Sequence, residues 1–177
     1  MRKRNNIIVL SLILASMIAS GCGGSSQPAA ASSTAAAAST ASRTPSDGKE
    51  YLEALKEAFH VYANCSYQFS DDLEAKKFDT ALKDIDSMDA ALSDIESVTP
   101  PEQYADQQKK IIDSIKTERE YLTNCRTFIG YCQKGSDITE DDLKKVQELN
   151  KTIENAPTDF ADTYIEVFRT VKADIDK

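Results

Sequence analysis

Apolar residues recur at steps of three and four along most of residues 48–177, the spacing that places side chains on one face of an α-helix. Asp47 and Glu50 have the spacing of a capping box and indicate the start of a first helix. Its apolar face consists of Leu52, Leu55, Phe59, Tyr62, Phe69 and Leu73. We expect a second helix from about Asp79, and its apolar face consists of Leu82, Ile85, Met88, Leu92 and Ile95.

The turn between these two helices has two candidate positions. Residues 76–78 are followed by a new apolar register, which favours a turn there, and residues 70–72 are the alternative. At 1.5 Å of rise per residue, a turn at 76–78 leaves Cys65 and Cys125 on the order of 20 Å apart along the bundle axis, whereas the alternative brings them level. We therefore predict no intramolecular disulfide, with Cys65, Cys125 and Cys132 in the core as small apolar residues.

The clearest signal for the start of a helix is the sequence Thr99-Pro100-Pro101-Glu102. Threonine can cap a free N–H at the helix start, proline suits the first turn, and glutamate closes the capping box. The inward face of this third helix consists of Tyr104, Gln108, Ile111, Ile115, Glu118, Leu122, Cys125, Ile129 and Cys132. Gly135 is the expected residue just beyond its end. The spacing therefore predicts that two polar side chains, those of Gln108 and Glu118, point into the core.

A fourth helix begins at the cap Thr139, with Ile138 and Leu143 as a hydrophobic staple. Its apolar face consists of Leu143, Val146, Leu149, Ile153, Phe160, Tyr164, Val167, Val171 and Ile175. Pro157 interrupts the helix while the apolar register continues, which predicts a kinked helix or two collinear pieces. Four helices with short loops predict an all-α, up-down-up-down four-helix bundle without strands.

The first 22 residues carry a different pattern. Arg2, Lys3 and Arg4 precede an apolar run over residues 7–15, and small residues lead to Cys22, which is the layout of a secretory signal peptide. The alternative is an uncleaved transmembrane anchor, but the apolar run is shorter than the roughly 20 residues that cross a bilayer.

Ala19-Ser20-Gly21-Cys22 resembles the lipobox of bacterial lipoproteins, with Ala19 where those proteins usually carry leucine. The resemblance implies that Cys22 receives a diacylglyceryl thioether and becomes the mature N-terminus. We expect a signal peptide over residues 1–21, a lipidated cysteine with a disordered, low-complexity tether over 22–47, and a bundle domain over 48–177. The expected location is the cell membrane, lipid-anchored, on the extracytoplasmic face.

The charge of the chain excludes one class of partner. Its net charge is −8, and removal of residues 1–21 takes away three basic residues and no acid, which leaves −11. Such a chain repels nucleic acid, so we expect no nucleic-acid partner and expect membrane contact through lipidated Cys22.

The candidate metal ligands are few. Glu57 and His60 have the Glu-x-x-His spacing of di-iron bundles, but that chemistry needs a second such motif and His60 is the single histidine. The acidic clusters Asp84-Ile85-Asp86, Asp89 and Asp141-Asp142 lack the glycine and terminal glutamate of a calcium loop, which favours solvated helix faces. We therefore expect no metal and no cofactor.

Two other sets of residues carry candidate chemistry. Glu118 needs a buried partner, for which Arg119, Lys116 or a tyrosine hydroxyl are available. Of the seven tyrosines, Tyr62 and Tyr67, with Phe69, are candidates for lining a ligand groove, although core packing is the simpler interpretation.

No catalytic motif is recognisable in the sequence, and we expect no enzyme. Residues 48–175 resemble small helical-bundle lipoproteins of bacterial envelopes, a resemblance that implies a fold and no activity. The first functional hypothesis is a non-catalytic interaction or envelope-scaffolding module. The alternative is a bundle that binds a small ligand or metal in its interior.

Overall fold

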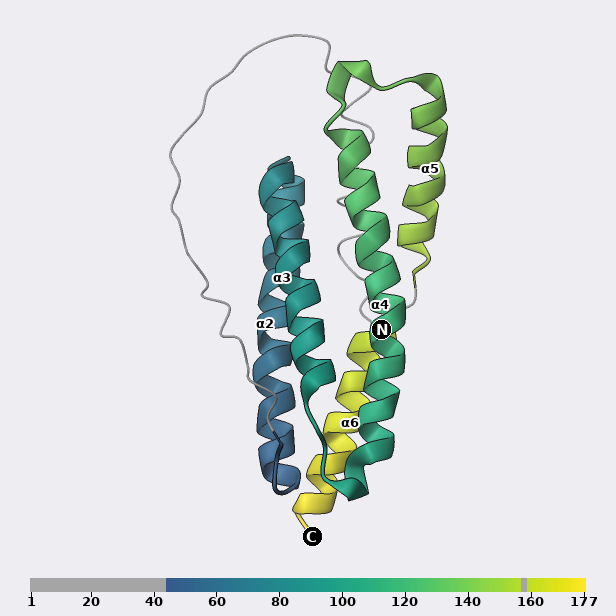
Figure 1. The fold of residues 1–177 in the computed structure, drawn as a ribbon. Helices are drawn as coiled ribbons and strands as arrows, with labels where there is room; N and C mark the ends of the chain where they lie inside the picture. Colours follow the sequence, from purple (N-terminus) through teal and green to yellow (C-terminus); the bar gives the residue numbers. More distant parts are fainter. Residues whose placement is uncertain (1–43, 157–158) are drawn as a thin grey trace, which may run out of the picture.

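The computed structural model describes residues 44–156 and 159–177 (Figure 1). Within these ranges the regular structure is helical and contains no strand, so the all-α prediction is confirmed. The α-helices are α2 (Gly48–Glu74), α3 (Phe78–Ser97), α4 (Ala105–Cys132), α5 (Glu140–Glu154) and α6 (Asp159–Ile175), with short 3-10 helices η1 (Glu102–Tyr104) and η2 (Gly135–Asp137).

Four of these helices enclose the main core. α2 packs on α3, α3 on α4, α4 on α6 and α6 on α2, while α5 lies along α4 (Figure 1). Most apolar positions expected from the sequence are buried, and Ile85, Ile111 and Ile129 are completely buried, whereas Leu143 and Leu149 of α5 are only partly buried. Ile175 is an exception, since 39% of its surface is exposed at the end of α6.

The turn between α2 and α3 lies at residues 75–77, close to the favoured prediction and away from the alternative at 70–72. Lys76 takes a left-handed backbone conformation, with a φ of 57°. The Lys76 N–H donates to the carbonyl of Leu73 at 3.1 Å, and the Lys77 N–H donates to the carbonyl of Asp72 at 2.8 Å. The left-handed residue thus satisfies carbonyls that the end of α2 leaves open.

Lys76→Gly should raise the free energy of unfolding by about 0.5–1 kcal/mol, because glycine adopts positive φ without steric cost. Urea unfolding of the bundle measures this change. Gly135→Ala is the reciprocal control: Gly135 has a φ of 54° and open space around it, so its substitution should be destabilising. A loss of stability in Lys76→Gly would contradict the expectation.

Two of the expected helix starts are confirmed. The Asp47 side chain accepts from the N–H of Glu50 at 2.9 Å, although the Glu50 carboxylate bonds to Ser46 instead of closing the box on Asp47. Thr139 Oγ1 accepts from the N–H of Asp142 at 3.1 Å, and the Asp142 carboxylate accepts from the N–H of Thr139 at 3.2 Å. The second pair is a complete capping box at the start of α5.

The predicted capping box at Thr99 is wrong. η1 begins at Glu102, α4 begins only at Ala105, and neither has a side-chain cap. The Tyr104 ring instead stacks on Tyr51 with centroids 5.7 Å apart, and a Cβ on Gly48 would lie 2.7 Å from the Tyr104 hydroxyl. Packing of Tyr104 against the start of α2 therefore decides where the regular helix begins.

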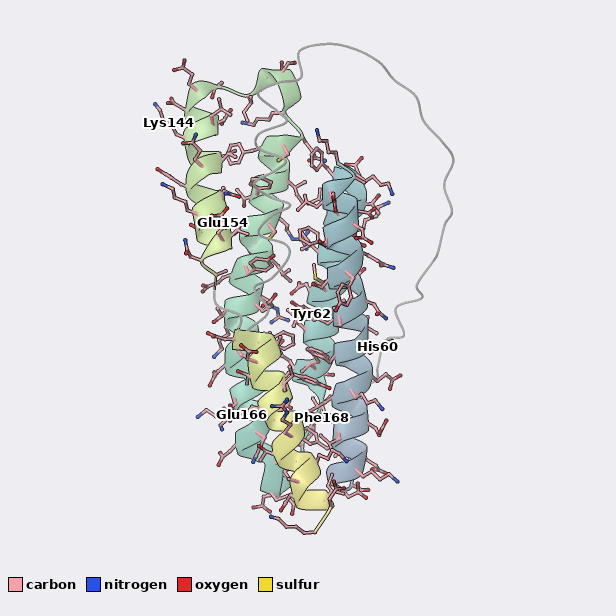
Figure 2. All side chains as sticks on the ribbon, turned by 180° about the vertical axis from the view of Figure 1, so that it is seen from behind. His60, Tyr62, Lys144, Glu154, Glu166 and Phe168 are labelled. Atoms are coloured by element: carbon pink, nitrogen blue, oxygen red, sulfur yellow. The ribbon has the colours of Figure 1, made fainter. Side chains whose placement is uncertain are left out.

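The last predicted helix is two helices, α5 and α6, and they are not collinear. α6 packs on both α4 and α2, whereas α5 packs along α4. Figures 1 and 2 show the two helices beside different parts of α4 and offset sideways from each other. Pro157 itself lies outside the described residues.

Candidate functional site

Cys22, the predicted lipidation site, lies outside the described residues, so its modification stays a prediction. Within residues 44–156 and 159–177, none of the helices combines the length and apolar character that crossing a bilayer requires. The polar groups inside the bundle are therefore the candidate site that the structure describes.

Gln108 is buried in the core, as the spacing of α4 predicts, and is 3% exposed. Tyr51 Oη donates to Gln108 Oε1 at 2.8 Å, and Gln108 Nε2 donates to the carbonyl of Ile95 at 2.8 Å. Burial raises the pKa of Tyr51, so its hydroxyl stays protonated and able to donate. These bonds connect α2, α4 and the end of α3.

Glu118 is also buried, at 2% exposed, and Tyr62 Oη donates to its Oε1 at 2.5 Å. A tyrosine hydroxyl was one of the three partners expected. Arg119 instead pairs with Asp89 and Glu96 of α3, and Lys116 pairs with Asp113 on its own helix. The tyrosine–carboxylate bond links α2 to α4 across the core and accounts for the inward position of Glu118.

An aromatic cluster surrounds this bond where α6 meets α2. Phe59 stacks on Tyr164 with centroids 3.7 Å apart and lies 5.8 Å from Phe160, whose ring meets Tyr62 edge-on at 4.9 Å. The candidate groove of Tyr62, Tyr67 and Phe69 is not formed, because Tyr67 is 75% exposed while the other two are buried. Tyr62 and Phe69 are therefore core packing residues, and Tyr67 is a surface residue.

The interpretation of Asp84 as part of a solvated face is wrong. Asp84 is 8% exposed, and its Oδ2 is buried without a hydrogen-bond partner. Burial and the neighbouring carboxylate of Asp72 raise the pKa of Asp84 to about 6. A signal was present in the sequence: Asp84 lies three residues after Ala81 and four before Met88, both of which are core residues.

Asp86, Asp89 and Asp141 lie on helix faces open to solvent, as expected, but the prediction is also wrong for Asp142, which is only 9% exposed. Asp86 pairs with Arg126 and Asp89 with Arg119, both from α4. Asp141 pairs with Lys144, and Asp142 pairs with Lys134 and caps α5. The pairs of Asp86 and Asp89 link α3 to α4, and within the described residues none of these clusters forms a cation-binding group.

Cys65, Cys125 and Cys132 are buried in the core, at the positions that the sequence predicted. The expected axial distance between Cys65 and Cys125 is wrong. Tyr62 and Glu118 are hydrogen-bonded and therefore lie at a similar height, with Cys65 three residues beyond Tyr62 and Cys125 seven residues beyond Glu118. The two cysteines therefore differ by only about 6 Å along the bundle axis. Burial raises the pKa of Cys132 to about 12 and also raises that of Cys65. Such protonated thiols are poor nucleophiles.

His60 lies on the outer side of α2, with Nε2 3.2 Å from Asn64 Nδ2 (Figure 2). Among the described residues, no group of three or more His, Cys, Asp or Glu side chains is arranged to hold a metal ion. The Glu57–His60 spacing therefore has no further ligands around it in this part of the chain.

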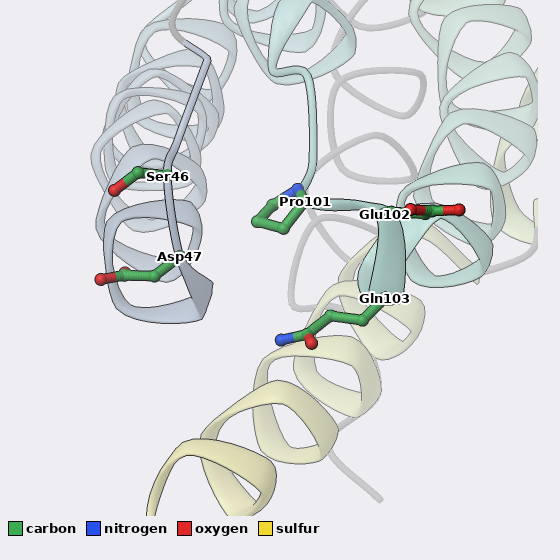
Figure 3. A pocket seen from close by; sticks show the side chains of 5 residues that line it. All are labelled: Ser46, Asp47, Pro101, Glu102 and Gln103. Atoms are coloured by element: carbon green, nitrogen blue, oxygen red, sulfur yellow. The ribbon is translucent and has the colours of Figure 1, made fainter.

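Two open surface pockets, each of about 440 Å³, lie at opposite ends of α2. The first is lined by Ser46, Asp47, Pro101, Glu102 and Gln103, and Figure 3 shows Glu102 turned away from Ser46 and Asp47. The second is lined by residues 76–80 with Cys132 and Gln133. Neither holds a convergent set of catalytic groups.

The chain matches no protein-family model, and no curated protein or solved structure is significantly similar to it.

Proposed function

We propose that this protein is a lipid-anchored lipoprotein of the extracytoplasmic membrane face, whose bundle is a non-catalytic interaction or envelope-scaffolding module. The observation that carries the proposal is the sequence from Met1 to Cys22: a basic start, an apolar run and a lipobox-like end. In this proposal the bundle has up-down-up-down topology, with α2, α3, α4 and α6 as its four helices and α5 beside α4.

The pairing of polar groups inside the bundle supports a non-catalytic role. Tyr51 and Gln108 satisfy each other, and Tyr62 donates to Glu118, so these buried groups serve the fold. The buried thiols of Cys65 and Cys132 have raised pKa values, the opposite of what a nucleophilic cysteine requires.

The segment over residues 22–47 is proposed as a tether. Its Ala, Ser, Thr and Gly composition offers little apolar surface to bury, which favours a flexible coil. A coil of about 25 residues has a root-mean-square span on the order of 27 Å, which is enough to hold the bundle clear of lipid headgroups. The acidic bundle would then meet a protein partner of the envelope without adhering to anionic lipid.

Cys22→Ser should abolish incorporation of labelled palmitate and release or stall the protein, because the thioether forms on that sulfur. Metabolic labelling and membrane fractionation in the native host measure both effects. Cys65→Ala, a buried thiol of α2, is the control and should keep full labelling. Palmitate labelling of Cys22→Ser at the wild-type level would refute the proposal.

A further inference from the structure

Two carboxyl groups meet inside the hairpin that α2 and α3 form. Asp84 of α3 is 8% exposed, and its Oδ2 has no hydrogen-bond partner. Asp72 of α2 is the neighbour whose charge and carboxyl group act on it, and the Asp72 side chain is itself only 16% exposed. Cys65 and Ser87 lie next to this pair, on α2 and α3 respectively.

The lysine that pairs with Asp72 does not neutralise both carboxylates. Lys77 Nζ lies 3.2 Å from Asp72 Oδ1, and this bond reaches Asp72 alone. The cations that α4 offers to α3 bind other carboxylates: Arg119 pairs with Asp89 and Glu96, and Arg126 pairs with Asp86.

Asp84 therefore faces α2, away from the cations of α4. Asp86 is two residues further along α3, which on a helix is nearly the opposite side. The charge of Asp84 also acts on the Cys65 thiol of α2, whose raised pKa keeps it protonated and uncharged near neutral pH. With both carboxyl groups ionised, two negative charges would share a buried site with a single lysine.

We propose that Asp72 and Asp84 share a proton and act as a pH-dependent clasp, which closes the α2–α3 hairpin in acid and loosens it near neutral pH. The shared proton lets one carboxyl group donate to the other across the helix pair. Its loss replaces that bond with repulsion between the two helices. The clasp gives the domain a response to the pH of its surroundings that is independent of the lipid anchor.

The direction of the pH effect follows from burial and from the charge of Asp72, which raise the pKa of Asp84 from 3.8 to about 6. A carboxyl group whose pKa is higher in the folded state contributes stability that is fully present below its unfolded pKa. That contribution is lost as the pH rises through the pKa that the group has in the folded state. The hairpin should therefore weaken progressively between about pH 4 and pH 6 and stay weakened above that range.

Amide hydrogen exchange of the full mature protein tests the clasp. After correction for the intrinsic pH dependence of exchange, the opening constant of residues 65–90 should rise about tenfold from pH 5 to pH 7.5, the change expected when a pKa of 3.8 becomes about 6 on folding. In Asp84→Asn the carboxamide N–H donates to Asp72 at either pH, because this bond needs no titrating proton. The opening constant should therefore be low at both pH values.

Asp71→Asn is the matched control, because it removes one negative charge from the exposed face of α2 one residue from Asp72. This variant should keep the tenfold change. A wild-type hairpin that opens equally at both pH values would overturn the clasp, and so would an Asp84→Asn variant that keeps the wild-type change or fails to fold.

Discussion

Replacing Phe160 with alanine should lower the free energy of unfolding by about 3–5 kcal/mol, the range for removing a buried phenylalanine. Phe160 is 1% exposed and contacts the rings of Tyr62 and Phe59 on α2. It lies in the first turn of α6, so its side chain fixes the position at which this helix joins the core. The cavity left by alanine would separate α6 from α2 at that point.

Urea unfolding measures the loss, and hydrogen exchange should show that protection falls first in α6. Tyr67→Ala is the matched control, because Tyr67 is an aromatic residue of α2 that is 75% exposed. Its removal should change the stability by no more than about 0.5 kcal/mol. A loss of stability below about 1 kcal/mol for Phe160→Ala would contradict the packing of α6 on α2 through Phe160.

Tyr62→Phe should cost about 1–3 kcal/mol, the range for leaving a buried acceptor without its donor. The substitution keeps the ring but removes the hydroxyl that donates to Glu118 Oε1, in a core where Glu118 is 2% exposed. A buried carboxylate that loses a donor pays a desolvation cost that water no longer offsets.

A double-mutant cycle separates this bond from simple packing. Tyr62→Phe combined with Glu118→Leu should recover most of the loss, because removal of both polar partners leaves an apolar contact. Tyr51→Phe, which removes the neutral bond to Gln108, is the comparison and should cost about 1 kcal/mol. Additive effects of the two substitutions at Tyr62 and Glu118 would contradict a direct interaction.

The sequence predicted most of the inward face of α4 and missed its buried Ser114, Tyr121 and Phe128. All nine expected positions from Tyr104 to Cys132 are buried, including the polar Gln108 and Glu118. This success has a physical cause: in a long helix one spacing repeats over many turns, so a single apolar stripe defines the buried face. The spacing also placed the turn after α2, because a new apolar register begins at α3.

The errors arise where contacts between helices override local signals. The start of α4 follows the stacking of Tyr104 on Tyr51, which no capping rule contains. The separation of α5 from α6 follows the aromatic contacts that draw α6 towards α2. The height of Cys125 relative to Cys65 depends on the register of two helices that lie diagonally across the core.

The candidate site was predictable only in part for the same reason. Spacing indicated that Glu118 points inward, but not which of three partners it meets, because that choice depends on the rotation of α2. The acidic residues around Asp84 in the sequence favour a surface position, which the structure contradicts. The proximity of Asp84 to Asp72 depends on the left-handed turn at Lys76, which sets the register between α2 and α3.

The most direct test of the central claim is the mass of the N-terminal peptide of the protein purified from membranes of its native host. The account predicts a peptide that begins at Cys22, lacks residues 1–21 and carries a diacylglyceryl group on the cysteine sulfur. A chain that begins at Met1, or a mature N-terminus whose Cys22 thiol is unmodified, would contradict it.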